Sequence, residues 1–250
     1  MPRSSLTVLD VGNTALKVVV FDGAGRVADC VRWGFSGDPE AAPVRATLRR
    51  LPKPVVAVSV SPVHLEAVRA AVGARLPVVG RDLPIPIENR TARPRETGAD
   101  RLCAALAARR RARGPAAAVG LGTAVTADAV DAAGAFLGGA IAPGLRSAAA
   151  GLAAAAPRLP LADLDPGPAA YPGETSGEAL RAGLLLGFAG LVDRLAAEAA
   201  RAASGGRRRA VRVYLHGGDA AAVAPFLKTR TVDAPHLVAE GARLAWLDAR

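Results

Sequence analysis

Apolar and polar positions alternate along the first thirty residues in a pattern typical of three consecutive β-strands. The predicted strands cover residues 7–11, 16–21 and 26–32, and short turns that contain Gly12 and Gly25 separate them. Glycine between alternating apolar segments favours hairpins, because it adopts turn conformations at little steric cost. The chain is therefore expected to begin with an antiparallel meander.

The rest of the first half predicts alternating helices and strands. A helix over residues 40–50 is followed by a buried strand over 55–59, a helix that begins at Ser61-Pro62 and a short strand over 76–79. Serine favours the N-cap of a helix and proline favours its first turn. The predicted order of this half is β-β-β-α-β-α-β.

A similar plan returns in the second half. A loop over 84–97 and a helix over 99–113 end at Gly114-Pro115, which interrupts the helical pattern. Beyond it the pattern predicts strands over 116–121, 125–130 and 136–141, helices over 144–155 and 177–203, a strand over 211–215, a helix after residue 219 and a final helix from about residue 237. We interpret the chain as two similar domains, 1–114 and 115–250, that arose by duplication.

The two predicted hairpins carry related turns. The first turn reads DVGNT from Asp10, and the second reads GLGTA from Gly120. Amide, hydroxyl and backbone N–H groups in such turns can donate to phosphate oxygens, and glycine lets the backbone approach a phosphate closely. Asp10 can hold a hydrated Mg²⁺ ion, and Lys17 adds a positive charge. Ordinary hairpin turns have a similar composition, so the first turn alone favours neither interpretation.

A third polar cluster, TGADR over residues 97–101, lies where a loop enters a predicted helix. Aspartate in a first turn stabilises the helix dipole, which is a purely structural role. Alternatively, Asp100 is the base that accepts a hydroxyl proton, and Arg101 pairs with a substrate carboxylate. Phosphoryl transfer depends mainly on positioning and charge neutralisation, so one carboxylate and a Mg²⁺ ion would suffice. Neither a P-loop nor a dinucleotide-binding fingerprint is present.

Composition excludes several other classes of protein. Hydrophobic residues make up 51% of the chain and charged residues 22%, which indicates a folded protein. The net charge of +10 comes almost entirely from arginine, and the clusters at 109–113 and 207–209 lack aromatic residues that could stack on bases. We therefore expect no nucleic-acid partner, although binding through these clusters would predict a steep dependence on salt.

Cysteine usage and hydropathy indicate the compartment. Cys30 and Cys103 form no CxxC pair or Cys/His cluster, so we expect neither a disulfide framework nor a zinc site. The N-terminus has no apolar signal core, and no run of 18 apolar residues could span a membrane. The sequence is typical of a cytoplasmic protein with no membrane partner.

Seven short motifs resemble, in order and spacing, those of the type III pantothenate kinases. They are DVGNT from Asp10, GADR from Gly98, GTAVTAD from Gly122, GGAIAPG from Gly138, ET at Glu174, GGD from Gly217 and LVAEG from Leu237. The similarity covers essentially the whole chain. It implies the α/β fold of the superfamily of sugar kinases, actin and heat-shock chaperone ATPases, with two ribonuclease H-like domains and the active site in the cleft between them.

The resemblance also implies an activity. Members of the family use ATP to phosphorylate the 4′-hydroxyl of pantothenate, which is the first step toward coenzyme A. They are typically homodimers with the substrate pocket at the subunit interface, and many need K⁺ or NH₄⁺. A homologue that binds nucleotide and regulates another protein without catalysis is the alternative hypothesis.

By position, the resemblance assigns roles to individual residues. The first phosphate loop would comprise Asp10, Val11, Gly12, Asn13, Thr14, Ala15, Leu16 and Lys17, with Asp10 at the metal. Thr123 would contact ATP from the second loop, and Gly217-Gly218 would lie toward the adenosine. Asp100 would accept the proton. Gly98, Ala99, Asp100, Arg101 and Thr175 would bind pantothenate.

Three positions depart from the family pattern. Gly120 stands where the family usually has the aspartate that holds the monovalent cation, so the potassium site is in doubt. Thr91 stands where an aromatic residue is usual, and His216 replaces a common threonine. We interpret His216 as structural, and the sequence assigns no role to His64 or His236.

Overall fold

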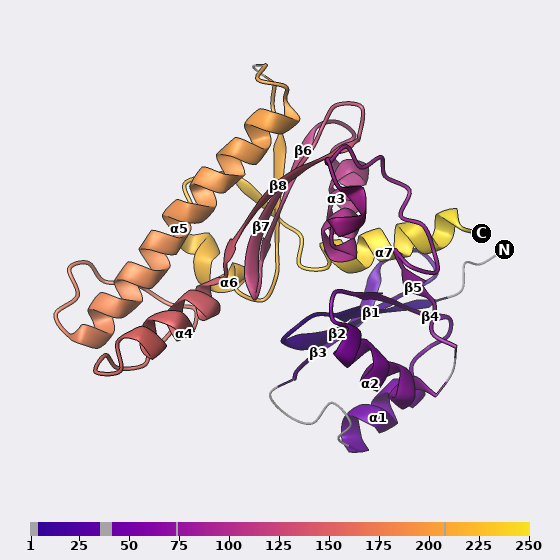
Figure 1. Cartoon of the computed structure of the whole chain (residues 1–250), viewed down its shortest axis with the longest axis horizontal. Helices are drawn as coiled ribbons and strands as arrows, with labels where there is room; N and C mark the ends of the chain where they lie inside the picture. Colours follow the sequence, from indigo (N-terminus) through magenta and orange to yellow (C-terminus); the bar gives the residue numbers. More distant parts are fainter. Residues whose placement is uncertain (1–4, 36–41, 74, 208) are drawn as a thin grey trace. The chain divides into compact units, whose positions relative to one another are not determined.

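The computed structural model describes residues 5–35, 42–73, 75–207 and 209–250 (Figure 1). The chain forms two compact units, each built around a five-stranded mixed sheet. Unit 1 comprises Met1–Ile87, Arg93–Ala107 and His236–Arg250, and unit 2 comprises Glu88–Ala92 and Ala108–Pro235. The expected α/β fold with two similar sheets is confirmed.

The sheet of unit 1 has the strand order β3-β2-β1-β4-β5. Its strands are β1 (Leu6–Val11), β2 (Ala15–Phe21), β3 (Val27–Gly34), β4 (Val55–Ser59) and β5 (Val78–Val79). The first three strands form the expected antiparallel meander, and β4 and β5 continue the sheet parallel to β1. The helices are α1 (Ala42–Arg49), α2 (Pro62–Val72), the 3₁₀ helix η1 (Pro94–Glu96), the first part of α3 (Ala99–Ala112) and α7 (Leu237–Asp248).

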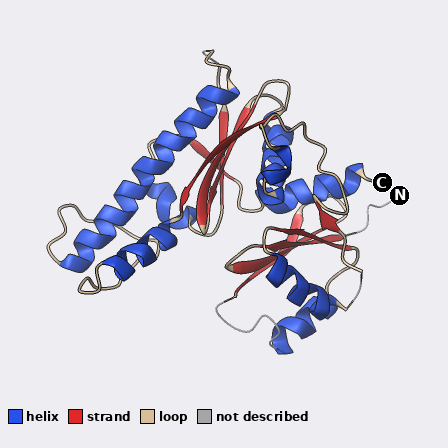
Figure 2. Ribbon diagram, viewed as in Figure 1, coloured by secondary structure: helices blue, strands red, loops and turns tan. Residues whose placement is uncertain are grey.

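Successive side chains of β1 and β2 point to opposite faces of the sheet of unit 1. Leu9 and Leu16 point to one face, where they pack with Leu48 of α1 and Leu65 of α2 in a buried core. The helix α7 contacts β1, β4 and β5 from the other face (Figure 2). Residues between those of the core, Asp10 among them, therefore point toward the α7 side.

The sheet of unit 2 repeats this topology with the order β10-β9-β6-β7-β8. Its strands are β6 (Ala116–Leu121), β7 (Ala124–Val130), β8 (Phe136–Pro143), β9 (Arg212–His216) and β10 (Thr231–Asp233). The strands β6, β7 and β8 form an antiparallel meander, and β9 and β10 lie parallel to β6. Its helices are α4 (Leu145–Ala155), α5 (Ser176–Ala203), the short α6 (Ala220–Val223) and the 3₁₀ helix η2 (Ala224–Phe226).

The long helix α5 covers one face of the second sheet (Figures 1 and 2). Leu185 and Val192 of α5 pack against Val119 and Val125 of the strands in a core of buried apolar side chains. The helix starts with a capping box in which the Thr175 hydroxyl accepts the N–H of Glu178 and the Glu178 carboxylate accepts the N–H of Thr175.

Most predicted elements lie within one or two residues of their observed bounds. The first two residues of the helix expected over 40–50 fall outside the described residues, and α1 is observed from Ala42. The strand β10 and the helices η1 and η2 were not expected. Ser61 is the N-cap residue of α2, as expected, but its side chain makes no cap hydrogen bond and contacts His64 Nδ1 instead.

The compact units do not follow a single boundary after residue 114. The C-terminal segment His236–Arg250 belongs to unit 1, because α7 packs on β1, β4 and β5. The short segment Glu88–Ala92 belongs to unit 2, where Arg90 forms an ion pair with Asp131 at 2.8 Å. Among the described residues, no helix is long and apolar enough to cross a membrane.

Candidate active site

The turn between β1 and β2 presents the polar groups of the first predicted phosphate loop. The N–H of Gly12 donates to the carbonyl of Ala15 over 3.0 Å and closes the turn. Asn13 and Thr14 are exposed at its tip. The side chains of Val11 and Leu16 are buried in the core, so these two residues can offer a ligand backbone atoms only.

His64, to which the sequence motifs assign no role, contacts the backbone of this turn. Its Nδ1 lies 3.2 Å from the carbonyl oxygen of Gly12 and 3.0 Å from Oγ of Ser61. A carbonyl can only accept, so a hydrogen bond to Gly12 places the proton on Nδ1. The His64 ring also stacks on Phe35, with ring centroids 3.8 Å apart. The signal was not visible in the sequence because one of the partners is a backbone atom.

Asp100 lies in the first turn of α3, where its Oδ1 accepts the N–H of Arg101 over 2.8 Å. Two glycines make room for this turn. A Cβ on Gly98 would lie 2.6 Å from Oδ1 of Asp100, and a Cβ on Gly80, which has φ of +88°, would lie 2.8 Å from Cβ of Ala99. The glycine of the GADR motif therefore leaves space for the carboxylate itself.

Asp10 and Asp100 lie close enough to interact, although 90 positions separate them. Burial raises the pKa of Asp10 from 3.8 to about 7, and repulsion from Asp100 adds to this rise. Lys17, which pairs with Asp10 across β1 and β2, opposes the rise. Burial also raises the pKa of Asp100, against the lowering effects of the Arg101 N–H and the Arg101 charge. The site thus holds two carboxylates whose ionised forms are poorly solvated.

Cys103 lies one helical turn after Asp100 and is completely buried. Burial and the two carboxylates raise the pKa of its thiol well above the usual value, so the sulfur stays protonated. The backbone of Cys103 is also the contact point for α7, because a Cβ on Gly241 would overlap the Cys103 carbonyl. This close approach gives a role to the glycine of the LVAEG motif, which fixes α7 against α3.

The donor set suits Mg²⁺. Among the described residues, no three His, Cys, Asp or Glu side chains form a group that could enclose a metal ion. Mg²⁺ needs no such group, because it keeps several waters and binds through one or two carboxylates and the phosphates of its substrate. A cation near Asp10 would also relieve the unfavourable burial of its charge.

The second hairpin turn is built in a similar way within unit 2. The N–H of Gly122 donates to the carbonyl of Ala124 over 3.1 Å, and the carbonyl of Thr123 accepts both the N–H of Gly144 and the hydroxyl of Ser147. A Cβ on Gly144 would overlap the Gly122 carbonyl. The glycine that ends the GGAIAPG motif is therefore required for close packing on this turn.

The predicted site residues are divided between the two units. Asp10, Lys17, Gly98, Asp100 and Arg101 belong to unit 1, where the structure brings Asp10, Lys17 and Asp100 together. Thr123 and Thr175 belong to unit 2, and Thr175 is exposed at the N-cap of α5. The roles of the individual residues stay predictions.

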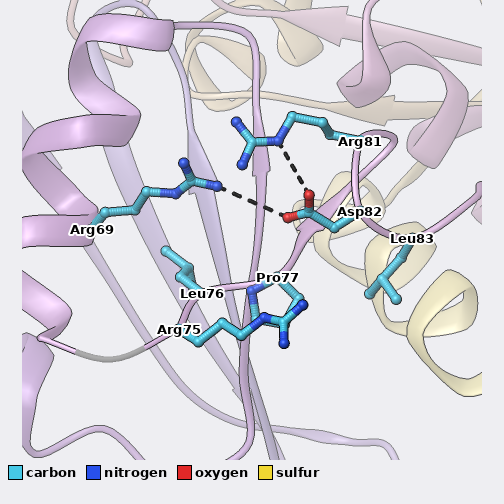
Figure 3. A pocket seen from close by; sticks show the side chains of 7 residues that line it. All are labelled: Arg69, Arg75, Leu76, Pro77, Arg81, Asp82 and Leu83. Atoms are coloured by element: carbon cyan, nitrogen blue, oxygen red, sulfur yellow. Dashed lines mark hydrogen bonds and ion pairs between the residues drawn. The ribbon is translucent and has the colours of Figure 1, made fainter.

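A cavity of about 420 Å³ lies elsewhere in unit 1 (Figure 3). Its lining consists of Arg69, Arg75, Leu76, Pro77, Arg81, Asp82 and Leu83. Asp82 approaches Arg81 at 3.3 Å and Arg69 at 3.9 Å, and it accepts the N–H of Val78. Two of the arginines therefore serve an ion-pair network that holds the turn after β5. None of the predicted site residues lines this cavity.

Solved structures with a similar fold define the class. The chain aligns with the activator of 2-hydroxyisocaproyl-CoA dehydratase from Clostridium difficile, solved with bound ADPNP, at a TM-score of 0.57 and 15% identity, over 98% of this chain and 95% of that one. The ethanolamine utilization protein EutJ from Carboxydothermus hydrogenoformans aligns at a TM-score of 0.55 and 14% identity, over 98% and 91%. The chain therefore shares its α/β fold with these solved structures.

Sequence comparison then gives the family. The family model of the type III pantothenate kinases matches residues 6–198. The type III pantothenate kinase of Oleidesulfovibrio alaskensis is 35% identical over 98% of both chains, and that of Frankia alni is 35% identical over 96% of this chain and 98% of the relative. The chain belongs to the type III pantothenate kinase family.

Proposed function

We propose that this protein uses ATP to phosphorylate the 4′-hydroxyl of pantothenate and so forms 4′-phosphopantothenate, the first step of coenzyme A biosynthesis. The observation that carries the proposal is the proximity of Asp10 and Asp100 in a chain that matches the family along almost its whole length. Asp10 is the second-last residue of β1, which leads into the first predicted phosphate loop, and Asp100 is the second residue of α3; both positions support the roles proposed for them.

In the proposed reaction, Asp100 accepts the proton of the 4′-hydroxyl as the oxygen attacks the γ-phosphorus of ATP. The bond between that phosphorus and the bridging oxygen breaks, and ADP leaves. A raised pKa suits Asp100 to this role, because a carboxylate with a higher pKa accepts a proton more readily than an ordinary one. Phosphopantothenate and ADP then dissociate, and Asp100 returns its proton to water.

The other residues would position the substrates. The loop from Asp10 to Lys17 and the turn at Thr123 would bind the phosphates, and Arg101 would pair with the carboxylate of pantothenate beside Gly98 and Ala99. Thr175 would contact the same substrate with its hydroxyl hydrogen, since its oxygen already accepts the Glu178 N–H. A bound Mg²⁺ would neutralise phosphate charge, and Asp10 would hold it through its water shell.

Substitution of Asp100 tests this mechanism. We expect Asp100→Asn to lower kcat by about 10²–10⁴-fold, the usual cost of a lost general base, while ATP still binds in calorimetry. Glu96→Gln is the matched control, because Glu96 is an exposed carboxylate four residues earlier, paired with Arg93 at 3.2 Å, and it should keep full activity. Equal rates for Asp100→Asn and the wild type would refute the assigned base.

We also propose a homodimer. Six of the eleven exposed large apolar side chains among the described residues fall between residues 141 and 186, namely Ile141, Leu152, Leu159, Leu161, Tyr171 and Leu186. Exposed apolar side chains concentrated in one segment support an association surface. Light scattering coupled to gel filtration should give twice the chain mass of 25.3 kDa, and a monomer at micromolar concentration would contradict the proposal.

A further inference from the structure

Gly120 and His216 are direct neighbours in the sheet of unit 2. They pair on the parallel strands β6 and β9, close to the carboxyl ends of both. Val213 and Leu215 of β9 point into the core under α5, so His216 and Tyr214 lie on the opposite face. Ligands of open α/β sheets bind beyond the carboxyl ends of the strands, which is where this pair lies.

The imidazole of His216 fills the space that a side chain at position 120 would need. A Cβ on Gly120 would lie 2.9 Å from Cε1 and 3.0 Å from Nε2 of the ring, and 2.9 Å from Oγ1 of Thr126. Carbon atoms in contact stay about 3.5–4.0 Å apart, so even alanine would have to displace the ring. Glycine at 120 and histidine at 216 therefore depend on each other.

The backbone around His216 is held in place. Gly217 has φ of +104°, and the N–H of Asp219 donates to the carbonyl of Leu121 over 3.1 Å. The Asp219 carboxylate is buried and accepts a hydrogen bond from Nε of Arg146 over 3.0 Å. These contacts fix the end of β9 against the end of β6, so the ring cannot leave Gly120 by a simple shift of the turn.

This arrangement does not fit the monovalent cation that the family resemblance implies. K⁺ is bound by oxygen atoms that replace its water shell. Position 120, where the family usually has an aspartate, offers no side-chain oxygen. A ring edge of carbon and nitrogen occupies most of the adjoining space, and the Thr126 hydroxyl is the one neutral side-chain oxygen among the three atoms nearest to the Cβ position. Asp128 lies two residues beyond Thr126 on the same strand, with its Oδ1 2.7 Å from the Cβ position of Gly139, and is thus packed against a different part of the sheet.

We propose that His216 takes the place of the monovalent cation and holds the Gly122–Thr123 turn in position for ATP, so that the enzyme works equally well without K⁺ or NH₄⁺. His216 is thus a positioning residue that acts through the turn. The inference rests on the proposed kinase function, because it concerns how that reaction binds its nucleotide.

The first test compares salts at constant ionic strength, which keeps charge screening equal. For the wild type, we expect the same kcat/KM for MgATP in the chlorides of potassium, ammonium, sodium and tetramethylammonium. We also expect the same Kd for MgADP by calorimetry and the same Tm in each salt. Activation of the wild type by K⁺ of about tenfold or more, equivalent to about 1.4 kcal/mol, would overturn the proposal.

Paired substitutions test whether Gly120 and His216 depend on each other. Gly120→Ala should lower Tm and raise KM for ATP more than it lowers kcat. Adding His216→Ala to it should restore part of the lost Tm, because the clash with the ring is gone while the close approach to Oγ1 of Thr126 stays. The double variant Gly120→Asp with His216→Thr should become K⁺-dependent in both kcat/KM and MgADP affinity. If Gly120→Ala leaves Tm and KM unchanged, or if the double variant ignores K⁺ in both measurements, the replacement is refuted.

The proposed kinase reaction and the proposed role of His216 can be refuted separately. Absence of phosphopantothenate in every salt would remove the proposed reaction. The calorimetric and Tm comparisons would still decide the role of His216, because they need only the nucleotide and the salts.

Discussion

At the scale of single residues, the environment of Asp10 decides how the site behaves. Its carboxylate is partly buried at the end of β1, next to Asp100, and Lys17 compensates only part of the cost. The ionised form of this carboxylate is unfavourable in the free protein, and a cation bound beside it, as proposed, would stabilise it. The residue therefore links stability, pH and ligand binding.

This link predicts a stability effect that depends on pH. A pKa raised from 3.8 to about 7 means that the fold is favoured by the protonated carboxyl, so this stabilisation is complete below about pH 4 and is lost as the pH rises through 7. The rise in the pKa of Asp10 would correspond to about 4 kcal/mol of the free energy of unfolding. Because the side chain is partly exposed, we expect an effect of about 1–2 kcal/mol. In EDTA at pH 8, Asp10→Asn should therefore raise Tm by about 2–8 °C.

The same substitution should have less than half of this effect at pH 5, where Asp10 is protonated in the folded wild type but already largely ionised in the unfolded chain. Mg²⁺ with ADP should stabilise the wild type at pH 8 more than it stabilises Asp10→Asn. Thermal scans of both proteins at the two pH values measure all of these differences. A lower Tm for the variant at pH 8 would show that the burial of Asp10 carries no such cost.

His64 predicts a second effect at this scale. His64→Ala removes the hydrogen bond to the Gly12 carbonyl, worth about 1 kcal/mol, and should raise KM for ATP roughly five- to tenfold with a smaller change in kcat. His64→Asn is the matched variant, because its amide nitrogen can occupy the position of Nδ1, and it should recover most of the affinity. Steady-state kinetics that show identical KM values for His64→Ala and the wild type would exclude this supporting role.

The sequence predicted some of these residues and missed the roles of others. Asp10 and Asp100 stood out because their motifs are local, and the structure brings the two side chains together. The shifted pKa values could not be foreseen, since they depend on burial by distant segments. His64 and His216 were given no active part, because their partners are a backbone carbonyl and an absent side chain.

At the scale of elements, α7 packs on β1, β4 and β5 of unit 1 and also touches α3 at one close point. Because Gly241 has no side chain, its backbone lies directly against the backbone of Cys103 in α3. The helix α3 carries Asp100 on its first turn, one turn before Cys103. The C-terminal helix therefore acts as a support for the proposed base.

Gly241→Ala is predicted to damage both stability and activity. The added methyl group overlaps the Cys103 carbonyl, and such overpacking costs about 1–3 kcal/mol, or about 2–12 °C in Tm. Activity should fall as well, because α3 must move with Asp100 on it. Gly151→Ala in α4 is the control, since a Cβ there has no atom within 4 Å among the described residues and alanine favours a helix. Equal thermal stability of Gly241→Ala and the wild type would contradict the account of this contact.

The predicted elements show which signals are local. Strands such as β1 and β6 were found because apolar runs between glycines are visible in sequence, and α3 was found from its alanine-rich run. The strand β10 was missed because it has only three residues, none of them buried, and forms at a sheet edge by pairing with β9. The placement of α7 was missed because it depends on contacts with β1, β4 and β5, which are distant in the sequence.

At the scale of the whole molecule, the two sheets are similar in topology but not in charge. Both have a meander of three antiparallel strands followed by two parallel strands. Asp10 and Gly120 occupy the same place, two residues before the turn glycine, yet the first is a carboxylate and the second leaves room for His216. The two predicted phosphate turns therefore differ, because the carboxylate at this position is present only in unit 1.

The most direct test of the central claim is to identify the product. Purified protein with ATP, Mg²⁺ and pantothenate should yield 4′-phosphopantothenate and ADP in equal amounts, detected by mass spectrometry and by ³¹P NMR, and Asp100→Asn should yield almost none in the same time. Calorimetric binding of nucleotide without any phosphopantothenate, in every salt tried, would contradict the claim and favour a homologue that binds nucleotide without catalysis.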